Sequence, residues 1–297
     1  MQEKTAKKPK EKPLIGFIGQ GWIGKNYAND FEARGYKTVR YSLEKEYVAN
    51  KDKIGECDIV FIAVPTPTTP DGFSAKIVEE GFKLVGKGKI AVVKSTIIPG
   101  STKRFQAENP DIVILYAPEF LSEATAAHDA AHPFSNIIGM PSDDEQHRDA
   151  AKAVFAVLPE SPFEHLCSST DAEFIKYSHN LSGYVQIILF NIMYDLSIEK
   201  GADWAQIQKA LEKDPYISSR YAKPVHKTGR GAGGGCFIKD FAALRELYGN
   251  TFPDDTLSQH ALRALECKNI DLLLKSGKDL ELLKGVYGDD PGAVCDS

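Results

Sequence analysis

The segment from residue 14 to residue 24 constrains the fold more than any other part of the chain. The apolar run Leu14–Ile18 has the length of a buried strand, and it leads into Gly19-Gln20-Gly21-Trp22-Ile23-Gly24 directly before a helical pattern that Gly35 ends. Glycines at the first, third and sixth positions permit a tight turn, close approach of a pyrophosphate and close helix–strand packing. This context predicts a dinucleotide-binding βαβ unit.

The pattern that follows predicts an α/β fold with a parallel sheet. Further strands are expected at 37–41, 58–64, 90–94 and 112–116, with a helix at about 77–87. Strands that alternate with helices form right-handed crossovers, and such sheets bind ligands beyond the carboxyl ends of their strands. Clusters of proline, glycine and polar residues follow the strands, so a ligand is expected at that edge.

The second half of the chain changes to long helical patterns. Thr170-Asp171-Ala172-Glu173 has the spacing of a capping box and predicts a helix that runs to about Lys200. Such a helix has roughly 30 residues and a length of about 45 Å. Asp203 with Gln206 predicts the next helix start, and helical patterns continue after Asp240.

This change of pattern predicts the domain organisation. We expect a Rossmann-type domain at 14–168, and a long central helix with a smaller helical domain at 169–297. The first 13 residues carry five lysines, and no hydrophobic stretch intervenes before the first expected strand, so they are expected to be a disordered basic tail and not a secretory signal. The apolar content of the long helix exceeds what a small domain buries, which predicts a homodimer. Its apolar residues are Ile187, Ile188, Leu189, Ile192, Met193 and Leu196.

Composition excludes several other classes of protein. A net charge of −5 on 297 residues gives no nucleic-acid footprint, and we expect no segment apolar enough to span a membrane. The five cysteines are odd in number, widely spaced and without a Cys-x-x-Cys pattern, which predicts free thiols, a reducing compartment such as the cytoplasm, and no zinc site. Four histidines are expected to be ordinary surface or core residues, with no ligand spacing to a second histidine or cysteine. They are His128, His132, His165 and His179.

A second glycine-rich segment, Gly229–Asp240, places Cys236 between a flexible loop and a probable helix that follows it. Glycines let a ligand approach closely, and the start of a helix favours a thiolate. Cys236 is therefore a candidate nucleophile. The alternative is an inert cysteine beside a flexible loop, which is the commoner role of a lone cysteine.

The end of the second expected strand bears on which dinucleotide is bound. The acidic residue that would bind the ribose of NAD is replaced by Ser42, and Glu44 is the nearest carboxylate. Arg40 and Lys45 offer the alternative of a 2′-phosphate site for NADP. We expect NAD.

Six motifs in sequence order resemble the UDP-glucose/GDP-mannose dehydrogenase family. They span residues 14 to 248 and are Gly19–Gly24, Val64–Pro67, Lys94–Ser101, Pro118–Glu123, Ala172–Asn180 with Phe190–Asn191, and Gly233–Asp240. The resemblance implies an enzyme that oxidises the C6 alcohol of a nucleotide sugar to a carboxylate with two NAD per turnover. It also implies that Cys236 binds the aldehyde as a thiohemiacetal and then a thioester.

The resemblance also assigns roles to individual residues. Lys176 and Asn180 share one helix face and stabilise an oxyanion, Asp240 orders a water with Thr96 and Lys176, and Glu119 is the base for thioester hydrolysis. From spacing alone, the Lys176–Asn180 pair reads as a solvated helix face and Asp240 as an acid in the first turn of a helix. Residues expected at the cofactor are Gly19, Gly21, Trp22, Ile23, Gly24, Ser42, Pro65, Thr66, Thr96, Glu123 and Lys239. Residues expected at the substrate are Phe120, Leu121, Lys176, Asn180, Gly233 and Gly234.

The chain departs from the family at positions that concern the nucleotide. Tyr216 replaces an arginine that reaches the sugar nucleotide, and Ala232 and Gly235 replace a phenylalanine and a serine in the glycine loop. Family members also continue into a UDP-binding domain, for which the residues after Cys236 are too few, so we expect weak turnover of free UDP-glucose. Two alternatives stay open. One is a non-catalytic or weakly active nucleotide-binding relative, and the other is a small hydroxyacid dehydrogenase.

Overall fold

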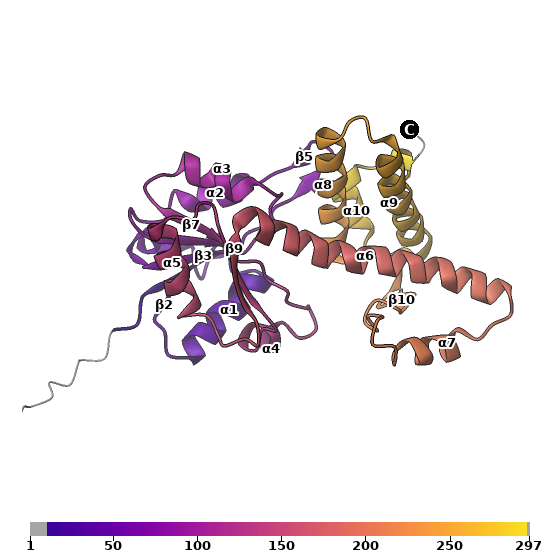
Figure 1. Cartoon of the computed structure of the whole chain (residues 1–297), viewed down its shortest axis with the longest axis horizontal. Helices are drawn as coiled ribbons and strands as arrows, with labels where there is room; N and C mark the ends of the chain where they lie inside the picture. The colour runs from indigo at the N-terminus through magenta and orange to yellow at the C-terminus, as the bar shows by residue number, and fades with distance from the viewer. Residues whose placement is uncertain (1–10, 296–297) are drawn as a thin grey trace, which may run out of the picture. The chain divides into compact units, whose positions relative to one another are not determined.

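The computed structural model describes residues 11–295, which divide into two compact units (Figure 1). Unit 1 contains the chain up to Pro65 and Lys76–Glu173, and unit 2 contains Thr66–Ala75 and the chain from Phe174 onward. The first ten residues of the expected basic tail lie outside the described part. Lys12 is held in place, because its ammonium donates to the carbonyl of Arg34 at 2.6 Å and lies 4.5 Å from the centre of the Tyr36 ring.

Unit 1 is a seven-stranded sheet with helices, as the sequence predicts for an α/β fold. The strand order is β2-β1-β3-β6-β7-β8-β9. The strands are β1 (Ile15–Ile18), β2 (Thr38–Tyr41), β3 (Ile59–Ile62), β6 (Ile90–Val93), β7 (Val113–Tyr116), β8 (Asn136–Met140) and β9 (Glu164–Ser168). The helices are α1 (Trp22–Ala33), η1 (Val48–Glu56), α2 (Lys76–Phe82), α3 (Ser101–Glu108), α4 (Ala126–Ala131) and α5 (Glu145–Phe155).

The sheet is parallel only in its first five strands. β8 runs antiparallel to β7, and β9 runs parallel to β8, so the expectation of a fully parallel sheet is wrong at this edge. Four of the five predicted strands are largely buried apolar segments and β2 is partly buried, whereas β9 is largely exposed and begins with Glu164 and His165. A half-exposed polar edge strand carries no continuous apolar run, which is why the sequence pattern did not reveal it.

The order of the strands sets where a ligand can bind in unit 1. β1 lies between β2 and β3 in the sheet. After β1 the chain forms β2 on one side of it and then crosses to form β3 on the other side, so the strand order reverses direction at β1. Ligands of open α/β sheets bind beyond the carboxyl ends of the strands at such a switch point. The turn Gly19–Gly24 begins directly after β1, at this position.

Aromatic packing holds α1 against the sheet beside that turn. The ring of Phe31 on α1 lies 5.5 Å from Phe17 of β1 and 5.3 Å from Phe61 of β3, and all three side chains are fully buried. Replacing a buried phenylalanine with alanine costs about 3–5 kcal/mol, so this cluster fixes the position of the helix start.

Unit 2 is mainly helical. Its elements are β4 (Thr68–Thr69), β5 (Gly72–Phe73), α7 (Trp204–Leu211), β10 (Val225–His226), β11 (Gly229–Arg230), α8 (Gly234–Thr251), α9 (Thr256–Ser276), α10 (Leu280–Tyr287) and η2 (Pro291–Cys295). The long helix α6 (Ser169–Glu199) begins in unit 1 and continues through unit 2, close to its predicted bounds (Figure 1). We had expected 66–75 in the nucleotide-binding domain, but Thr68 donates to the carbonyl of Lys239 on α8 at 3.0 Å, within unit 2.

The start of α6 differs from the predicted capping box. The side chain of Ser168, one residue before the helix, accepts from the amide of Asp171 at 3.1 Å. Glu173 does not turn back to the helix start. Its buried carboxylate accepts from the amides of Gly100 at 2.5 Å and Thr102 at 2.8 Å, at the start of α3, and from the Thr102 hydroxyl at 2.6 Å. Burial raises the pKa of Glu173, while these three donors favour its charged form.

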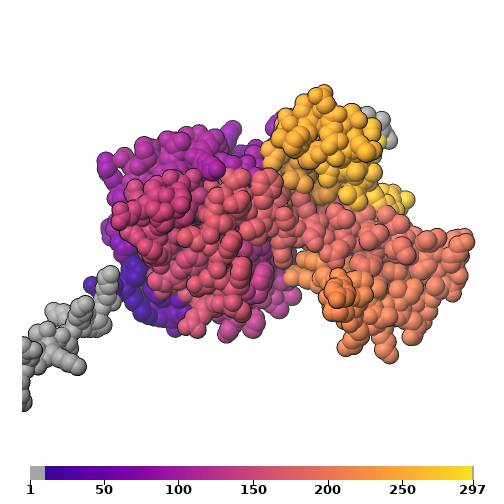
Figure 2. Space-filling model, viewed as in Figure 1, coloured from indigo at the N-terminus to yellow at the C-terminus, as the bar shows by residue number. Residues whose placement is uncertain are grey.

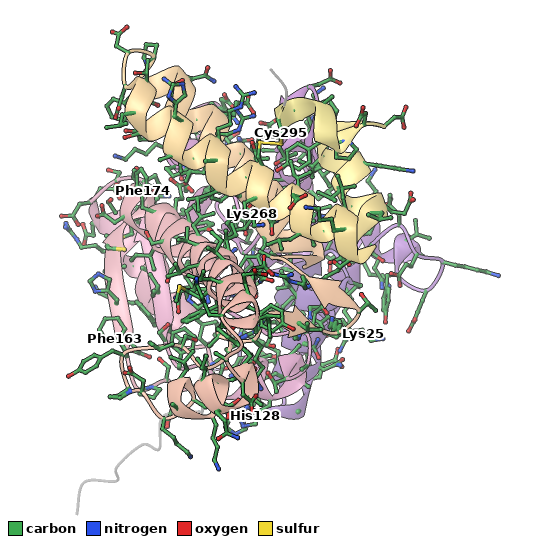
Figure 3. All side chains as sticks on the ribbon, turned by 90° about the vertical axis from the view of Figure 1, so that its right-hand side faces the viewer. Lys25, His128, Phe163, Phe174, Lys268 and Cys295 are labelled. Atoms are coloured by element: carbon green, nitrogen blue, oxygen red, sulfur yellow. A yellow bond between two sulfur atoms is a disulfide. The ribbon has the colours of Figure 1, made fainter. Side chains whose placement is uncertain are left out.

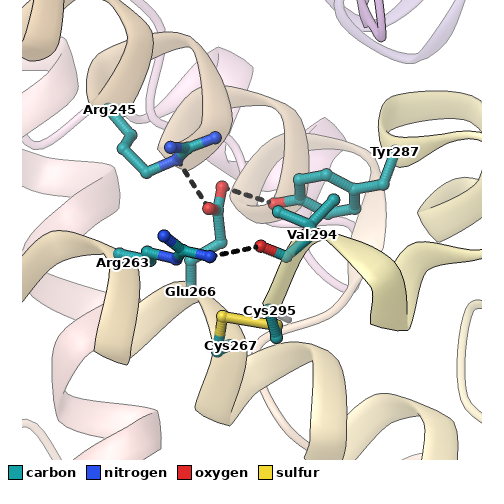
Figure 4. The surroundings of a disulfide bond; sticks show 7 residues. All are labelled: Arg245, Arg263, Glu266, Cys267, Tyr287, Val294 and Cys295. Carbon is teal, nitrogen blue, oxygen red and sulfur yellow. Dashed lines mark hydrogen bonds and ion pairs between the residues drawn. A yellow bond between two sulfur atoms is a disulfide. The ribbon is translucent and has the colours of Figure 1, made fainter. Parts of the chain in front are cut away.

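The expectation that all five cysteines are free is also wrong. Cys267 of α9 is bonded to Cys295 of η2 with 5.5 Å between their Cα atoms (Figures 3 and 4). Beside the disulfide, the buried carboxylate of Glu266 pairs with Arg245 at 2.6 Å and accepts from the Tyr287 hydroxyl at 2.9 Å (Figure 4). A cytoplasmic location, which we inferred from free thiols, loses that support and stays a prediction.

The statement that no segment could span a membrane was too strong for α6. This helix is long and apolar enough to cross a bilayer by length and composition, although it also carries Lys176 and Asp195. Leu189, Ile192, Met193 and Leu196 are each about half exposed. Figure 2 shows this part of the chain, coloured salmon, at the surface.

Removing the disulfide is expected to lower the free energy of unfolding. Because 28 residues separate the cysteines, the cross-link restricts the unfolded chain, and its loss in Cys267→Ser is expected to cost about 3–4 kcal/mol. Urea unfolding checks this, with Cys167→Ser as the control because Cys167 has no disulfide partner. An unchanged urea midpoint for Cys267→Ser in non-reducing buffer would contradict the assignment.

The contacts of Glu173 give a second prediction. Glu173→Gln replaces one acceptor oxygen with an amide nitrogen and leaves at least one buried donor at the start of α3 without a partner. Each unsatisfied buried donor costs about 1–3 kcal/mol, so this loss is expected in the free energy of unfolding. Glu164→Gln, on the exposed strand β9, is the matched control and should unfold like the wild type. Equal unfolding curves for the two variants would contradict this prediction.

Candidate functional site

The turn after β1 requires glycine at its first and last positions. Gly19 has φ +93°, and a Cβ there would lie 2.1 Å from the carbonyl oxygen of Ala63. A Cβ on Gly24 would lie 1.9 Å from the carbonyl oxygen of Gly19. These two contacts bring the first turn of α1 directly onto the turn that precedes it, as the predicted fingerprint requires.

Gly21 is different, because a Cβ there would meet nothing within 4 Å. Its hydrogen therefore leaves open space in front of the start of α1, where the backbone can approach a ligand. α1 has no side-chain cap and no acidic residue in its first turn, so its first N–H groups and its positive dipole end are available to an anion. This arrangement fits the pyrophosphate of a dinucleotide.

Two further side chains in this turn were predicted at the cofactor, and one was not. Trp22 is half exposed and Ile23 is partly buried. Gln20 was not predicted, yet its Oε1 is buried without a hydrogen-bond partner, while its Nε2 donates to the carbonyl of Gly19 at 3.0 Å. An unpaired acceptor buried in this turn is a feature that a bound polar ligand would satisfy.

The end of β2 favours NAD over NADP. Arg40 is committed within the protein, because its Nε donates to Glu32 at 2.9 Å and its second terminal nitrogen donates to Asn29 at 2.9 Å. It is therefore not free to bind a 2′-phosphate. Ser42 accepts from the amide of Glu44 at 3.2 Å, which fixes the turn at the place where an acidic residue was expected.

The ends of β6 and β7 bring two predicted residues to one edge of the sheet. Thr96 and Glu119 are both buried, and they follow neighbouring parallel strands. Glu119 accepts from the amide of Leu121 at 2.9 Å. Lys94, which we did not predict, is also buried and donates to the carbonyl of Ala117 at 3.3 Å, two residues before Glu119. Lys94 thus holds the end of β7 that carries this carboxylate.

The segment after Glu119 is ordered by its own contacts within unit 1. The ring of Phe120 lies 5.2 Å from Phe134, and Leu121 packs against the apolar core. The amide of Ser122 donates to Asp129 at 2.9 Å. Glu123 is exposed.

Two other residues predicted at the cofactor lie at a boundary between the units. Pro65 is the last residue of the first segment of unit 1, and Thr66, the next residue, belongs to unit 2 and is buried.

The carboxylate of Asp240, a predicted residue, is buried in unit 2 and binds two other predicted residues. Each oxygen of the Asp240 carboxylate accepts from a different side chain. One accepts from the side-chain amide nitrogen (Nδ2) of Asn180 at 2.7 Å, and the other accepts from the ammonium of Lys239 at 2.5 Å. Asp240, Asn180 and Lys176 are each less than 10% exposed. The interpretation of Lys176 and Asn180 as a solvated helix face is therefore wrong.

Cys236 lies in the first turn of α8 rather than ahead of it, because the helix begins at Gly234. Asp240 is one turn further along, so the interpretation of Asp240 as a first-turn acid is also wrong. Cys236 and Asp240 are four residues apart and share one face of α8.

Cys236 also differs from the other free thiols of residues 11–295. It is exposed, whereas Cys57 is buried and Cys167 is partly buried. Burial raises the pKa of Cys57 to about 12 and that of Cys167 to about 11, which makes both poor nucleophiles.

The glycine loop before Cys236 is held by residues that the sequence did not single out. Ala232 is fully buried, and Asn269 pairs with both its amide and its carbonyl, at 2.7 and 3.0 Å. The amide of Gly234 donates to Asp279 at 2.7 Å. No short motif marks such residues, because their partners lie about 40 positions away in the chain.

One expectation about the histidines needs correction. His128 and His132 are four residues apart, and their rings stack with 4.8 Å between their centres. These two histidines therefore do have the spacing of a helical pair. Within residues 11–295, no group of three or more histidine, cysteine or acidic side chains is arranged to hold a metal ion.

The glycine turn at a sheet switch point defines unit 1 as a dinucleotide-binding fold, and family models match both halves of the chain. Residues 35–158 match the NAD-binding domain, and residues 170–263 the central domain, of the UDP-glucose/GDP-mannose dehydrogenase family. Together these matches cover well over half of the chain. The chain belongs to the UDP-glucose/GDP-mannose dehydrogenase family, and its cofactor is NAD.

Individual relatives agree with this family. The UDP-glucose 6-dehydrogenase YwqF of Bacillus subtilis is 30% identical over 264 residues, which cover 84% of this chain and 56% of YwqF. The chain spans about half the length of the curated relatives it matches. Two solved structures show the same fold. A UDP-glucose dehydrogenase from Pyrobaculum islandicum superposes with a TM-score of 0.73 at 21% identity, and the match covers 98% of this chain and 90% of the Pyrobaculum chain. The 3-hydroxyisobutyrate dehydrogenase of Mycobacterium tuberculosis has a TM-score of 0.68 at 15% identity, and the match covers 93% of this chain and 99% of the Mycobacterium chain.

Substitutions in the first glycine turn separate folding from cofactor binding. Gly21→Val fills open space and is expected to fold normally, but its side chain occupies the place of the pyrophosphate and should weaken NADH binding by at least about 100-fold. Gly19→Ala is the matched comparison and should unfold more easily, because its Cβ meets the Ala63 carbonyl. Thermal unfolding and fluorescence titration with NADH check both. Wild-type NADH affinity in a folded Gly21→Val would contradict the site.

Proposed function

We propose that the chain carries the catalytic residues of an NAD-dependent dehydrogenase that oxidises the C6 alcohol of a nucleotide sugar to a carboxylate, with UDP-glucose as the representative substrate. The observation that carries the proposal is the placement of an exposed thiol, Cys236, one helical turn before a buried carboxylate, Asp240, which Asn180 and Lys239 bind. A dehydrogenase for simple alcohols has no use for such a thiol.

The chemistry accounts for each of these residues. Bound at the turn Gly19–Gly24, NAD would supply a hydride acceptor for each of two oxidation steps. After the first step, the thiolate of Cys236 adds to the aldehyde carbon and forms a thiohemiacetal whose oxygen carries the charge. After the second step the carbon is a thioester, and water cleaves the C–S bond, releasing the carboxylate and restoring the thiol.

The roles of the remaining residues follow from charge. Lys176 and Asn180 supply a cation and an amide donor in a buried setting, which suits them to stabilise the oxyanion. Asp240 fixes the side-chain amide of Asn180. The roles expected for Thr96, in ordering the attacking water, and for Glu119, as the base for thioester hydrolysis, stay predictions. In unit 1, the turn Gly19–Gly24 holds the cofactor, and the roles expected for Pro65, Thr66, Glu123 and Lys239 stay predictions.

The competing function is a small hydroxyacid dehydrogenase, which the fold alone also permits because the 3-hydroxyisobutyrate dehydrogenase chain matches over nearly its whole length. The stoichiometry of NADH separates the two. The proposal predicts two NADH per UDP-sugar consumed, and loss of the carboxylate product in Cys236→Ala, with Cys167→Ser active as the control. One NADH per small hydroxyacid, unchanged in Cys236→Ala, would establish the alternative. NADH binding without turnover of any of these substrates would establish a non-catalytic relative.

We also propose that α6 pairs with its counterpart in a homodimer. Its half-exposed residues Leu189, Ile192, Met193 and Leu196 follow the spacing of one helix face. Leu189→Glu with Met193→Glu is expected to convert the dimer to a monomer, as measured by light scattering at micromolar concentration. Glu199→Gln, at the end of the helix, is the control. A monomeric wild type would contradict the dimer, and insertion of the wild type into lipid vesicles would identify a membrane contact instead.

A further inference from the structure

The loop that leads to Cys236 is fastened by side chains from a single corner at the end of α9. This corner consists of Ser276, Lys278 and Asp279 at the end of α9 and of Asn269, about two turns earlier in the same helix; all four lie beyond the last of the six family motifs. Ser276 accepts from the amide of Arg230 at 3.0 Å, and Lys278 donates to the carbonyl of Gly231 at 2.8 Å.

Further hydrogen bonds hold the loop as far as the start of α8, the helix that carries Cys236. Asn269 pairs with both backbone groups of Ala232, and Asp279 accepts from the amide of Gly234. Four backbone positions out of five consecutive ones are therefore held by side chains from the same corner. Asn269 and Lys278 are buried, so these hydrogen bonds are shielded from water.

The corner itself has a fixed shape. α9 ends at Gly277 with φ +65°, and the amide of Lys278 donates back to the carbonyl of Leu273 at 3.0 Å. Asp279 follows with φ +55°, a left-handed conformation that is uncommon outside glycine, and its carbonyl accepts the first hydrogen bond of α10 from Leu283. Asp279 thus has this uncommon conformation and is also the residue whose carboxylate accepts from the amide of Gly234.

The contact between Asp279 and the loop is close. A Cβ on Gly233 would lie 2.0 Å from the Asp279 carboxylate and 2.8 Å from the Lys278 side chain. The loop can approach the corner only because residue 233 has no side chain. Since Gly233 and Gly234 start α8, this contact sets the direction from which Cys236 is presented.

We propose that Asp279 is a positioning residue for the nucleophile. Its carboxylate holds the first amide of α8 and thereby keeps the thiol of Cys236 in the place where it adds to the aldehyde. Asp279 does not touch the reacting atoms in this scheme and acts through Gly234. The inference has a mechanical half, that Asp279 orders the segment around Gly234, and a catalytic half, that this order is needed for turnover. The catalytic half rests on the proposed function, whereas the mechanical half does not.

Two substitutions at residue 279 test the inference, because they differ in one respect. Asp279→Asn and Asp279→Gly both remove the charge and both tolerate φ +55°, but only Asn keeps an oxygen that can accept from Gly234. The first readout is amide hydrogen exchange of the segment 231–236 in the protein without substrate. Exchange is expected to be faster in Asp279→Gly and close to wild type in Asp279→Asn, with similar melting temperatures. Equal exchange in the two variants would overturn the mechanical half.

The second readout is turnover. Asp279→Gly is expected to lower kcat by roughly 10- to 100-fold, with KM within about threefold of the wild type, because a small misplacement of the nucleophile affects the chemical step. Asp279→Asn should restore most of kcat. Faster exchange with unchanged kcat in Asp279→Gly would overturn the catalytic half. Absence of turnover in the wild type itself would refute the proposed function and leave the exchange result standing.

A double-mutant cycle covers the case in which Asp279→Gly is unstable. Gly233→Ala alone is expected to lower kcat and loosen the segment, because its Cβ meets the Asp279 carboxylate. In the Asp279→Gly background that obstacle is gone, and only the flexible end of Lys278 is near. The effect of Gly233→Ala on exchange should therefore be smaller in that background. Additive effects would contradict a direct contact between residues 233 and 279.

Discussion

The buried carboxylate of Asp240 is the constraint on which the arrangement of unit 2 depends. A charged group removed from water is stable only when both of its oxygens are bound, and here Asn180 of α6 and Lys239 of α8 bind one each. α6 and α8 must therefore run close together at this point. The rings of Tyr184 and Phe241, stacked with 4.0 Å between their centres, pack the two helices one turn further along. Lys176, one turn before Asn180 on α6, is also buried, whereas Cys236 is exposed in the first turn of α8.

The two glycine-rich turns serve the proposed chemistry for different physical reasons. In the first, Gly19 and Gly24 are needed because backbone atoms of the protein lie where a Cβ would be, whereas Gly21 leaves space for a ligand. In the second, Gly233 is needed because the carboxylate of Asp279 lies against it, and this contact orients a helix start. In the proposed chemistry, the first turn thus accommodates the cofactor and the second positions the nucleophile.

The parts of the fold that the sequence predicted are those in which local pattern and tertiary role agree. Four of the five predicted strands were recognisable because buried parallel strands are continuous apolar runs, and α6 because its helical pattern is long. β9 was missed because an exposed edge strand such as Glu164–Ser168 carries no such run, whereas β8 is buried and was missed although it contains Ile137 and Ile138. The capping role of Glu173 was wrong because its partners, Gly100 and Thr102, are distant in sequence and compete with the local hydrogen bond.

The same distinction applies to the candidate site. Cys236, Lys176, Asn180 and Asp240 lie in recognisable motifs; the last three are buried, and Asn180 donates to Asp240. Asn269 and Asp279 carry no local signal, since an asparagine within a helix and an aspartate in a turn are ordinary until the loop packs against them. The Cys267–Cys295 bond was missed for a similar reason, because cysteine spacing alone does not show which pairs meet in the fold.

The most direct test of the central claim is to identify the covalent intermediate on Cys236. The protein is mixed with UDP-glucose and excess NAD, quenched in acid within one turnover, digested and analysed by mass spectrometry. The account predicts a uronyl thioester on the peptide that contains Cys236, which hydroxylamine removes and which Cys236→Ala lacks. Formation of two NADH per sugar with an unmodified Cys236 peptide at every quench time would contradict it.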